Sequence, residues 1–108
     1  DRLRSRGLGD VYKRQGKYKS AIVAFKNALK QYPESKRREE IMYLIVDSGY
    51  RLASNSISEK QTDRYLSMLD SYLSFKEEFP ESTHIKSLDR MAQQARDYLD
   101  RNNKDNNI

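Results

Sequence analysis

The sequence contains no cysteine and no tryptophan, and its 108 residues include only one histidine, two prolines and four glycines. Without cysteine, disulfide bonds and thiolate metal sites are excluded, and one histidine cannot complete a zinc site. Two of the glycines lie in the first fifteen residues, so no glycine-rich loop is available to hold a phosphate group. There is also no run of about 18 apolar residues, so no membrane-spanning helix is expected.

The residues that are abundant are charged residues, at 34% of the chain, and tyrosine, at eight residues. The charged share exceeds the roughly 25% of ordinary domains. A chain of this size and composition can bury a narrow apolar seam more readily than a wide spherical core. We therefore expect one domain, or part of one, built as an elongated stack of helices.

The first fifteen residues, DRLRSRGLGDVYKRQ, are predicted to be foreign to the protein. Residues 10–15 back-translate to GAT GTG TAT AAG AGA CAG, which is similar to a transposon end used in sequencing libraries, and the same frame fits adapter sequence upstream. Leu8-Gly9-x-x-Tyr12 would otherwise match the first helix of a tetratricopeptide repeat. We interpret residues 1–15 as an adapter-derived artefact that could still coil into a helix. They hold five basic and two acidic residues, which leaves 16 basic and 14 acidic residues beyond Gln15. The pI near 9.5 is then no indication of nucleic-acid binding.

Apolar residues at steps of three and four predict helices at about residues 17–32, 36–54, 59–79 and 83–101. Pro33 and Pro80 end the first and third, because proline has no backbone N–H to continue a helix. The expected buried stripes are Tyr18, Ala21, Ile22, Phe25, Ala28, Leu29 and Tyr32; Ile41, Leu44, Ile45 and Leu52; Tyr65, Met68, Leu69, Tyr72, Phe75 and Phe79; and Ile85, Leu88, Met91, Ala92, Ala95, Tyr98 and Leu99. Residues 102–108 are polar and lack periodicity, which predicts a C-terminal tail.

Two segments repeat each other. FKNALKQYPES (25–35) parallels YLSFKEEFPES (72–82) at an offset of 47 residues. The matched pairs are Phe25 with Tyr72, Ala28 with Phe75, Tyr32 with Phe79 and Pro33 with Pro80. Repeats in this range of lengths are typical of stacked helical pairs, in which each pair buries its apolar face against its neighbours. The predicted fold class is therefore all-α, with antiparallel helical hairpins of a tetratricopeptide-like α-solenoid.

The segment GKYKSAIVAFKNALKQYP resembles the second half of a tetratricopeptide repeat, with Gly16 at the turn, Phe25 at a contact position and Pro33 at the end. From Gly16 to about Arg101 the chain resembles the C-terminal part of the outer-membrane assembly lipoproteins of the BamD (YfiO-like) family, in the form seen in Bacteroidetes. The likeness is carried by REEIMYLIVDSGYRLASNSISEKQTDRYLSMLDSYLSFKEEFPES and DRMAQQARDYLD. The second unit departs from a 34-residue repeat by about one helical turn and a longer loop, as this family does.

The resemblance implies a non-catalytic scaffold for protein–protein interaction that takes part in the assembly of outer-membrane β-barrel proteins. It implies a place at the periplasmic face of the outer membrane, with a lipid anchor upstream as the only membrane attachment. The expected partners are the barrel-forming assembly subunit and outer-membrane protein clients, with no cofactor and no nucleic acid. Two interpretations stay open beside it: a generic tetratricopeptide adaptor that binds a peptide in another pathway, and an accessory domain of an enzyme.

No catalytic, cofactor-binding or metal-binding residue is predicted. Adjacent acidic residues such as Glu39 and Glu40 diverge by about 100° around a helix and cannot converge as an acid–base pair. His84 has no partner motif and is expected to be exposed. The candidates for partner contact lie where the first helix of a repeat lines a groove, and aromatic residues and arginine are favoured at interfaces. These candidates are Tyr43, Asp47, Tyr50 and Arg51, although packing between repeats explains the two tyrosines equally well.

Overall fold

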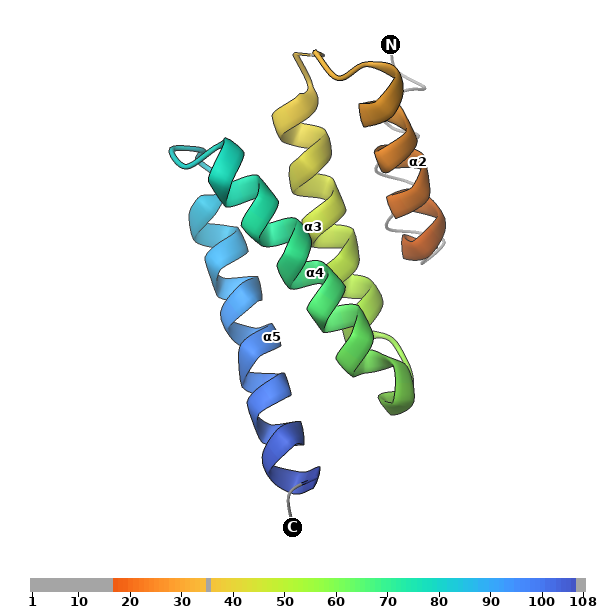
Figure 1. The fold of residues 1–108 in the computed structure, drawn as a ribbon, viewed down its shortest axis with the longest axis vertical. Helices are drawn as coiled ribbons and strands as arrows, with labels where there is room; N and C mark the ends of the chain where they lie inside the picture. The colour runs from red at the N-terminus through yellow and green to blue at the C-terminus, as the bar shows by residue number, and fades with distance from the viewer. Residues whose placement is uncertain (1–16, 35, 107–108) are drawn as a thin grey trace.

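The computed structural model describes residues 17–34 and 36–106. Within these ranges the chain forms four helices and no strand, which confirms the predicted all-α class (Figure 1). The helices are α2 (Tyr18–Gln31), α3 (Arg38–Ser54), α4 (Ser58–Glu78) and α5 (Ile85–Asn106). Successive helices run in opposite directions, as the predicted hairpins require (Figure 1). The segment 1–15, interpreted as adapter-derived, lies outside the described residues.

The two prolines end α2 and α4 in the same way. Each helix stops two residues before its proline, at Pro33 and Pro80. The residue that follows the helix, Tyr32 or Phe79, still donates its backbone N–H to the carbonyl four residues earlier, at 2.9 and 2.8 Å. Both residues then leave the helical conformation, at φ −132°, ψ 65° and φ −128°, ψ 63°. A residue before proline is disfavoured in the α region, so the repeated proline produces a repeated turn.

The last helix is longer than the sequence predicted. A tail was expected over residues 102–108, but α5 continues to Asn106, and of this expected tail residues 107–108 lie outside the described part. No glycine or proline occurs between Ile85 and the end of the sequence. Extending an existing helix fixes only one further residue for each new hydrogen bond, so polar residues alone do not end it.

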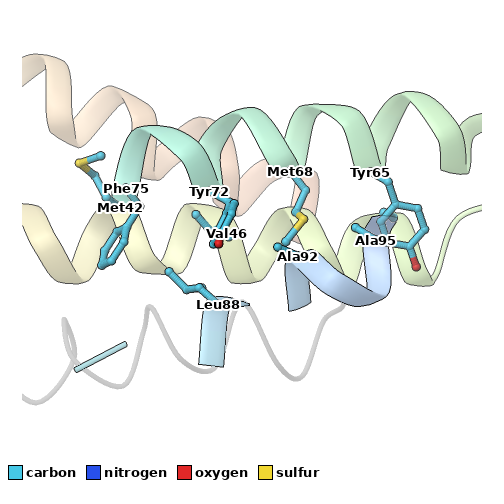
Figure 2. Close-up of a cluster of buried hydrophobic side chains, with 10 residues drawn as sticks. Met42, Val46, Tyr65, Met68, Tyr72, Phe75, Leu88, Ala92 and Ala95 are labelled. Atoms are coloured by element: carbon cyan, nitrogen blue, oxygen red, sulfur yellow. The ribbon is translucent and has the colours of Figure 1, made fainter. Parts of the chain in front are cut away.

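The central helix of the described fold is α3, which packs against α2, α4 and α5, while α4 also packs against α5. The larger apolar cluster joins α3, α4 and α5 and consists of Met42, Val46, Ala53, Tyr65, Met68, Tyr72, Phe75, Leu88, Ala92 and Ala95. In Figure 2 the large side chains Tyr65 and Met68 of α4 are directed toward Ala92 and Ala95 of α5. The smaller cluster joins α2 and α3 and consists of Ala21, Phe25 and Ile45.

Tyr32 does not belong to this core, although the apolar stripe placed it there. It is 66% exposed, whereas its repeat counterpart Phe79 packs against the larger cluster with its ring centroid 5.4 Å from that of Phe75. The position that corresponds to Phe75 in the first unit is Ala28, which has no ring to pack against a tyrosine. The repeat thus preserves the turn but not the contact.

An arginine links the two proline turns across the fold. Arg38, at the start of α3, donates from Nη2 to Glu78 Oε1 at 2.9 Å and from Nε to Glu78 Oε2, and its Nη1 donates to the carbonyl of Pro33 at 3.3 Å. Nearby, the Ser82 hydroxyl donates to Glu39 Oε2 at 2.5 Å. The Arg38–Glu78 pair is bidentate, and the two parallel hydrogen bonds give it geometric specificity. Because both side chains are about one-third exposed, the pair stabilises the fold by at most about 1 kcal/mol.

We expect replacement of Phe75 by alanine to lower the free energy of unfolding by about 3–5 kcal/mol, because this ring is fully buried. The matched control is Leu73→Ala on the same helix, at a side chain that is 54% exposed, with an expected loss of about 0.5 kcal/mol or less. Urea denaturation followed by circular dichroism measures both. A milder Phe75→Leu variant keeps the comparison measurable if the alanine variant is unfolded. Equal losses at the two positions would contradict the core described here.

Candidate functional site

The four residues predicted to contact a partner all lie on α3, but they do not form one exposed surface. Asp47 is only 4% exposed, whereas the side chain of Arg51 is 45% exposed. Tyr43 and Tyr50 are half-buried. The structure therefore divides the predicted set between the interior and the surface of the protein.

Tyr43 packs against the turn that precedes α5. Its ring stacks on the ring of His84, with centroids 4.0 Å apart and planes inclined by 14°, and Phe75 meets the same histidine edge-on at 6.5 Å. His84 was expected to be exposed, but this stack leaves it half-buried. The stack joins α3 to the next helical unit, so packing between repeats accounts for the position of Tyr43.

Tyr50 also faces the neighbouring helices. Its hydroxyl donates a hydrogen bond to Gln94 Oε1 on α5. Its ring centroid lies 6.3 Å from that of Tyr65 on α4, which in turn lies 4.9 Å from that of Tyr98 on α5. Three tyrosines from three helices thus meet at one junction. Packing between repeats, which the sequence left open for both tyrosines, also accounts for Tyr50.

Asp47 and Arg51 form a pair in which one partner is buried and the other reaches the surface. Arg51 Nε donates to Asp47 Oδ2 at 3.2 Å. The other carboxylate oxygen, Asp47 Oδ1, is buried and has no hydrogen-bond partner among the described residues. Burial raises the pKa of Asp47, and the nearby charge of Arg51 opposes this effect without cancelling it. The carboxylate thereby holds the arginine side chain, one turn further along, in a defined position at the surface.

A groove between α2 and α4 is lined by residues that are not among the predicted contact residues. It is formed by two adjoining hollows of about 260 Å³ each. The first is lined by Lys19, Ile22, Val23, Lys26, Ile45, Gly49, Leu52, Arg64, Ser67, Met68 and Ser71. The second is lined by Lys26, Leu29, Met42, Ile45, Asp70, Ser71 and Ser74. The shared residues Lys26, Ile45 and Ser71 make the two hollows one continuous surface.

Small residues keep this groove open. Ser67, Ser71 and Ser74 follow one another at steps of four and three, so they lie on one face of α4. Gly49 lets α3 approach α4 closely, since a Cβ at this position would lie 3.3 Å from the Cβ of Met68. The spacing of the serines and the glycine inside a helix was the available sequence signal. The groove was not predicted because Ile45, which forms part of its base, was assigned only to a buried stripe.

No group of three or more histidine or acidic side chains in residues 17–34 and 36–106 is arranged to hold a metal ion. Across the same residues, none of the helices combines the length and apolar character that crossing a membrane requires. Two features of the described residues are suited to contact with another molecule: the oriented Arg51 and the groove between α2 and α4.

Residues 10–104 match the family described as YfiO: Outer membrane lipoprotein. This range begins inside the segment 1–15 and includes all of α2, α3 and α4 and most of α5. No curated protein and no solved structure matches the chain.

Replacing Asp47 by asparagine tests the cost of burying this charge. Because burial raises the pKa of Asp47 above its ordinary 3.8, the carboxyl contributes stability that is present below pH 3.8 and is lost as the pH rises through the raised folded value. We expect Asp47→Asn to raise the melting temperature at pH 7 and to leave it unchanged at pH 3. Thermal melts at the two pH values measure the effect. A variant less stable than its parent at pH 7 would show that burying the charge of Asp47 does not destabilise the fold.

Glu78→Gln is expected to show the opposite pH dependence. The hydrogen bond from Arg38 lowers the pKa of Glu78 below its ordinary 4.5, so this group contributes stability above pH 4.5 that is lost as the pH falls through the lowered folded value. The variant should lose at most about 1 kcal/mol of unfolding free energy at pH 7, since the pair lies at the surface. In acid, variant and parent should converge. A destabilisation that persists at low pH would show that the glutamate acts through packing.

Proposed function

Because the chain belongs to the YfiO family of outer membrane lipoproteins, we propose that it is a non-catalytic scaffold in the assembly of outer-membrane β-barrel proteins. The proposed partners are the barrel-forming assembly subunit and outer-membrane protein clients, bound at the periplasmic face of the outer membrane. An N-terminal lipid upstream of these residues would provide the attachment to the membrane, and no cofactor or nucleic acid takes part. The family match over residues 10–104 is the observation that carries this proposal.

The contacts within the fold support the role of a scaffold. A surface that binds with little loss of conformational freedom must be rigid before binding. Here the Tyr43–His84 stack and the Tyr50–Gln94 hydrogen bond set the position of α3 relative to the unit that contains α5. The tyrosines that were candidates for direct contact thus contribute to a rigid framework and offer only their partly exposed sides to a partner.

Arg51 is the residue of the predicted set that we propose for direct contact with a partner. Its side chain is partly exposed, and its hydrogen bond to Asp47 orients it. Arginine is enriched among the residues that carry most of the energy of protein interfaces. Asp47 therefore acts through Arg51, as a residue that positions the arginine rather than one that touches a partner.

A second function is compatible with the same helices. Stacked helical hairpins also serve as adaptors that bind a short peptide in other pathways, and architecture alone does not separate the two. The family match favours the first function. The sequence upstream of this segment discriminates between them, because a signal peptide followed by a lipidated cysteine is required by the first and not by the second.

Affinity capture tests the proposed function. We expect the full-length lipoprotein that contains this chain to recover the barrel-forming assembly subunit from detergent-solubilised outer membranes. Arg51→Gln should weaken that recovery about tenfold, which corresponds to about 1.4 kcal/mol of binding free energy. Arg90→Gln, at an exposed arginine on α5, is the matched control and should leave recovery unchanged.

The outcomes separate the function from the contact. Absence of the assembly subunit from the captured material would contradict the proposed function. Recovery that is equal for Arg51→Gln and the parent protein would contradict only the role of Arg51. Circular dichroism of both variants checks that their helices are intact.

A further inference from the structure

We propose that the groove between α2 and α4 binds an acidic, amphipathic segment of a partner protein. This inference rests on the proposed function as a protein-binding scaffold and adds a second binding surface to it. On a helix of 3.6 residues per turn, the groove residues Ile45, Gly49 and Leu52 lie about 100–160° from Arg51 around α3. The groove and the proposed contact face of Arg51 are therefore on different faces of α3.

The base of the groove is apolar. Ile45, Gly49 and Leu52 come from α3, and Met68 comes from α4. On the side of α2, Ile22 lies beside Val23, which is 55% exposed. An apolar side chain of a partner that enters the hollow would also cover this exposed valine. Removing apolar surface from water in this way favours binding.

The charge along the α2 side of the groove is positive and is not balanced. α2 contains Lys19, Lys26 and Lys30 but no acidic residue. Among the described residues, no carboxylate lies within ion-pair distance of Lys19 or Lys26. Two cations that stand seven residues apart, two turns along one helix, can meet two carboxylates of a bound segment. Charge complementarity of this kind gives specificity and faster association.

The α4 side of the groove adds a third cation and a row of hydroxyl groups. Arg64 is held in place by a hydrogen bond from its Nη1 to Ser56 Oγ at 2.6 Å, and no carboxylate of the described residues pairs with it. Ser67, Ser71 and Ser74 can each donate a hydrogen bond to the bound segment. Asp70, at the far end of the second hollow, is the one acidic residue of the lining, so the complementary carboxylates are expected toward Lys19 and Arg64.

These features favour a protein segment over a lipid surface. The positive charges lie along the two walls of a groove that has an apolar base, whereas a membrane surface would need them on one flat or convex face. The bound segment should therefore carry apolar side chains on one face and glutamate or aspartate on the other. Binding to anionic lipid alone is a contrary outcome that the experiment includes.

Peptide binding to the 108-residue chain tests the inference, with a fluorescent fifteen-residue peptide of leucine and glutamate in a helical amphipathic pattern as the probe. The matched probe has lysine in place of every glutamate. Fluorescence anisotropy is expected to show at least tenfold tighter binding of the acidic peptide, weakening as salt is added. Equal affinity for the two peptides, or no binding of the acidic one at millimolar concentration, would overturn the inference.

Two variants place the binding in the groove. Lys19→Glu combined with Lys26→Glu reverses the charge of exposed side chains, and we expect it to weaken binding of the acidic peptide at least tenfold. Lys86→Glu, at an exposed lysine on α5, is the control and should bind like the parent. Undiminished binding by the double variant would overturn the inference. The inference would also be overturned if the chain bound tightly to vesicles that contain phosphatidylglycerol but did not bind the acidic peptide.

Cross-linking identifies the natural occupant, because the chain has no cysteine of its own. Ser67→Cys in the 108-residue chain accepts a single photo-reactive label in the groove, and Asp97→Cys on α5 provides the control position. Mass spectrometry of the segment cross-linked at residue 67 in outer-membrane extracts is expected to find an acidic, apolar sequence that residue 97 does not capture. A basic segment, or a second copy of this chain, would overturn the inference. These results are independent of whether the barrel-forming assembly subunit is recovered, so the two proposals fail separately.

Discussion

The packing of α3 against three other helices is the constraint on which the rest of the structure depends. Its residue Val46 is fully buried in the cluster that holds α4 and α5, while Ile45, next to it, belongs to the cluster that holds α2. Adjacent positions on a helix point about 100° apart, so one helix can serve two clusters at once. A change on α3 therefore affects both hairpins, whereas a change on the outer face of α2 or α5 affects one.

Polar side chains fix the register between these helices, because apolar packing alone would allow one helix to shift along another. Arg38 joins the start of α3 to the end of α4, and Tyr50 joins the C-terminal part of α3 to α5. Hydrogen bonds need particular distances and directions, and so they select one register among several that would bury similar apolar area. The tyrosine-rich composition has a physical role here, because a tyrosine ring fills space in the seam while its hydroxyl reaches a partner on another helix.

The two faces of α3 that remain for other molecules differ in their chemistry. One presents Arg51, whose orientation depends on a buried carboxylate that lacks a second partner among the described residues. The other contributes Ile45 and Leu52 to a groove beside the lysines of α2. An oriented arginine suits a polar contact at a defined point, whereas an apolar groove with cationic walls suits a longer segment. A scaffold built from stacked hairpins can offer both because its core occupies only a narrow seam.

Local chemistry in the sequence determined the helices, their ends at the prolines, the repeat of 47 residues and the all-α class. Apolar periodicity and the missing N–H of proline act over a few residues, and they need no knowledge of the neighbours. The family was likewise recognisable from the sequence alone. Only the tertiary structure decided that Asp47 is buried, that Tyr32 is exposed, that Tyr43 stacks on His84 and that small residues of α3 and α4 leave a groove open. Each of these depends on which helix covers a given face, and Tyr43 and His84 come together only when two distant segments pack.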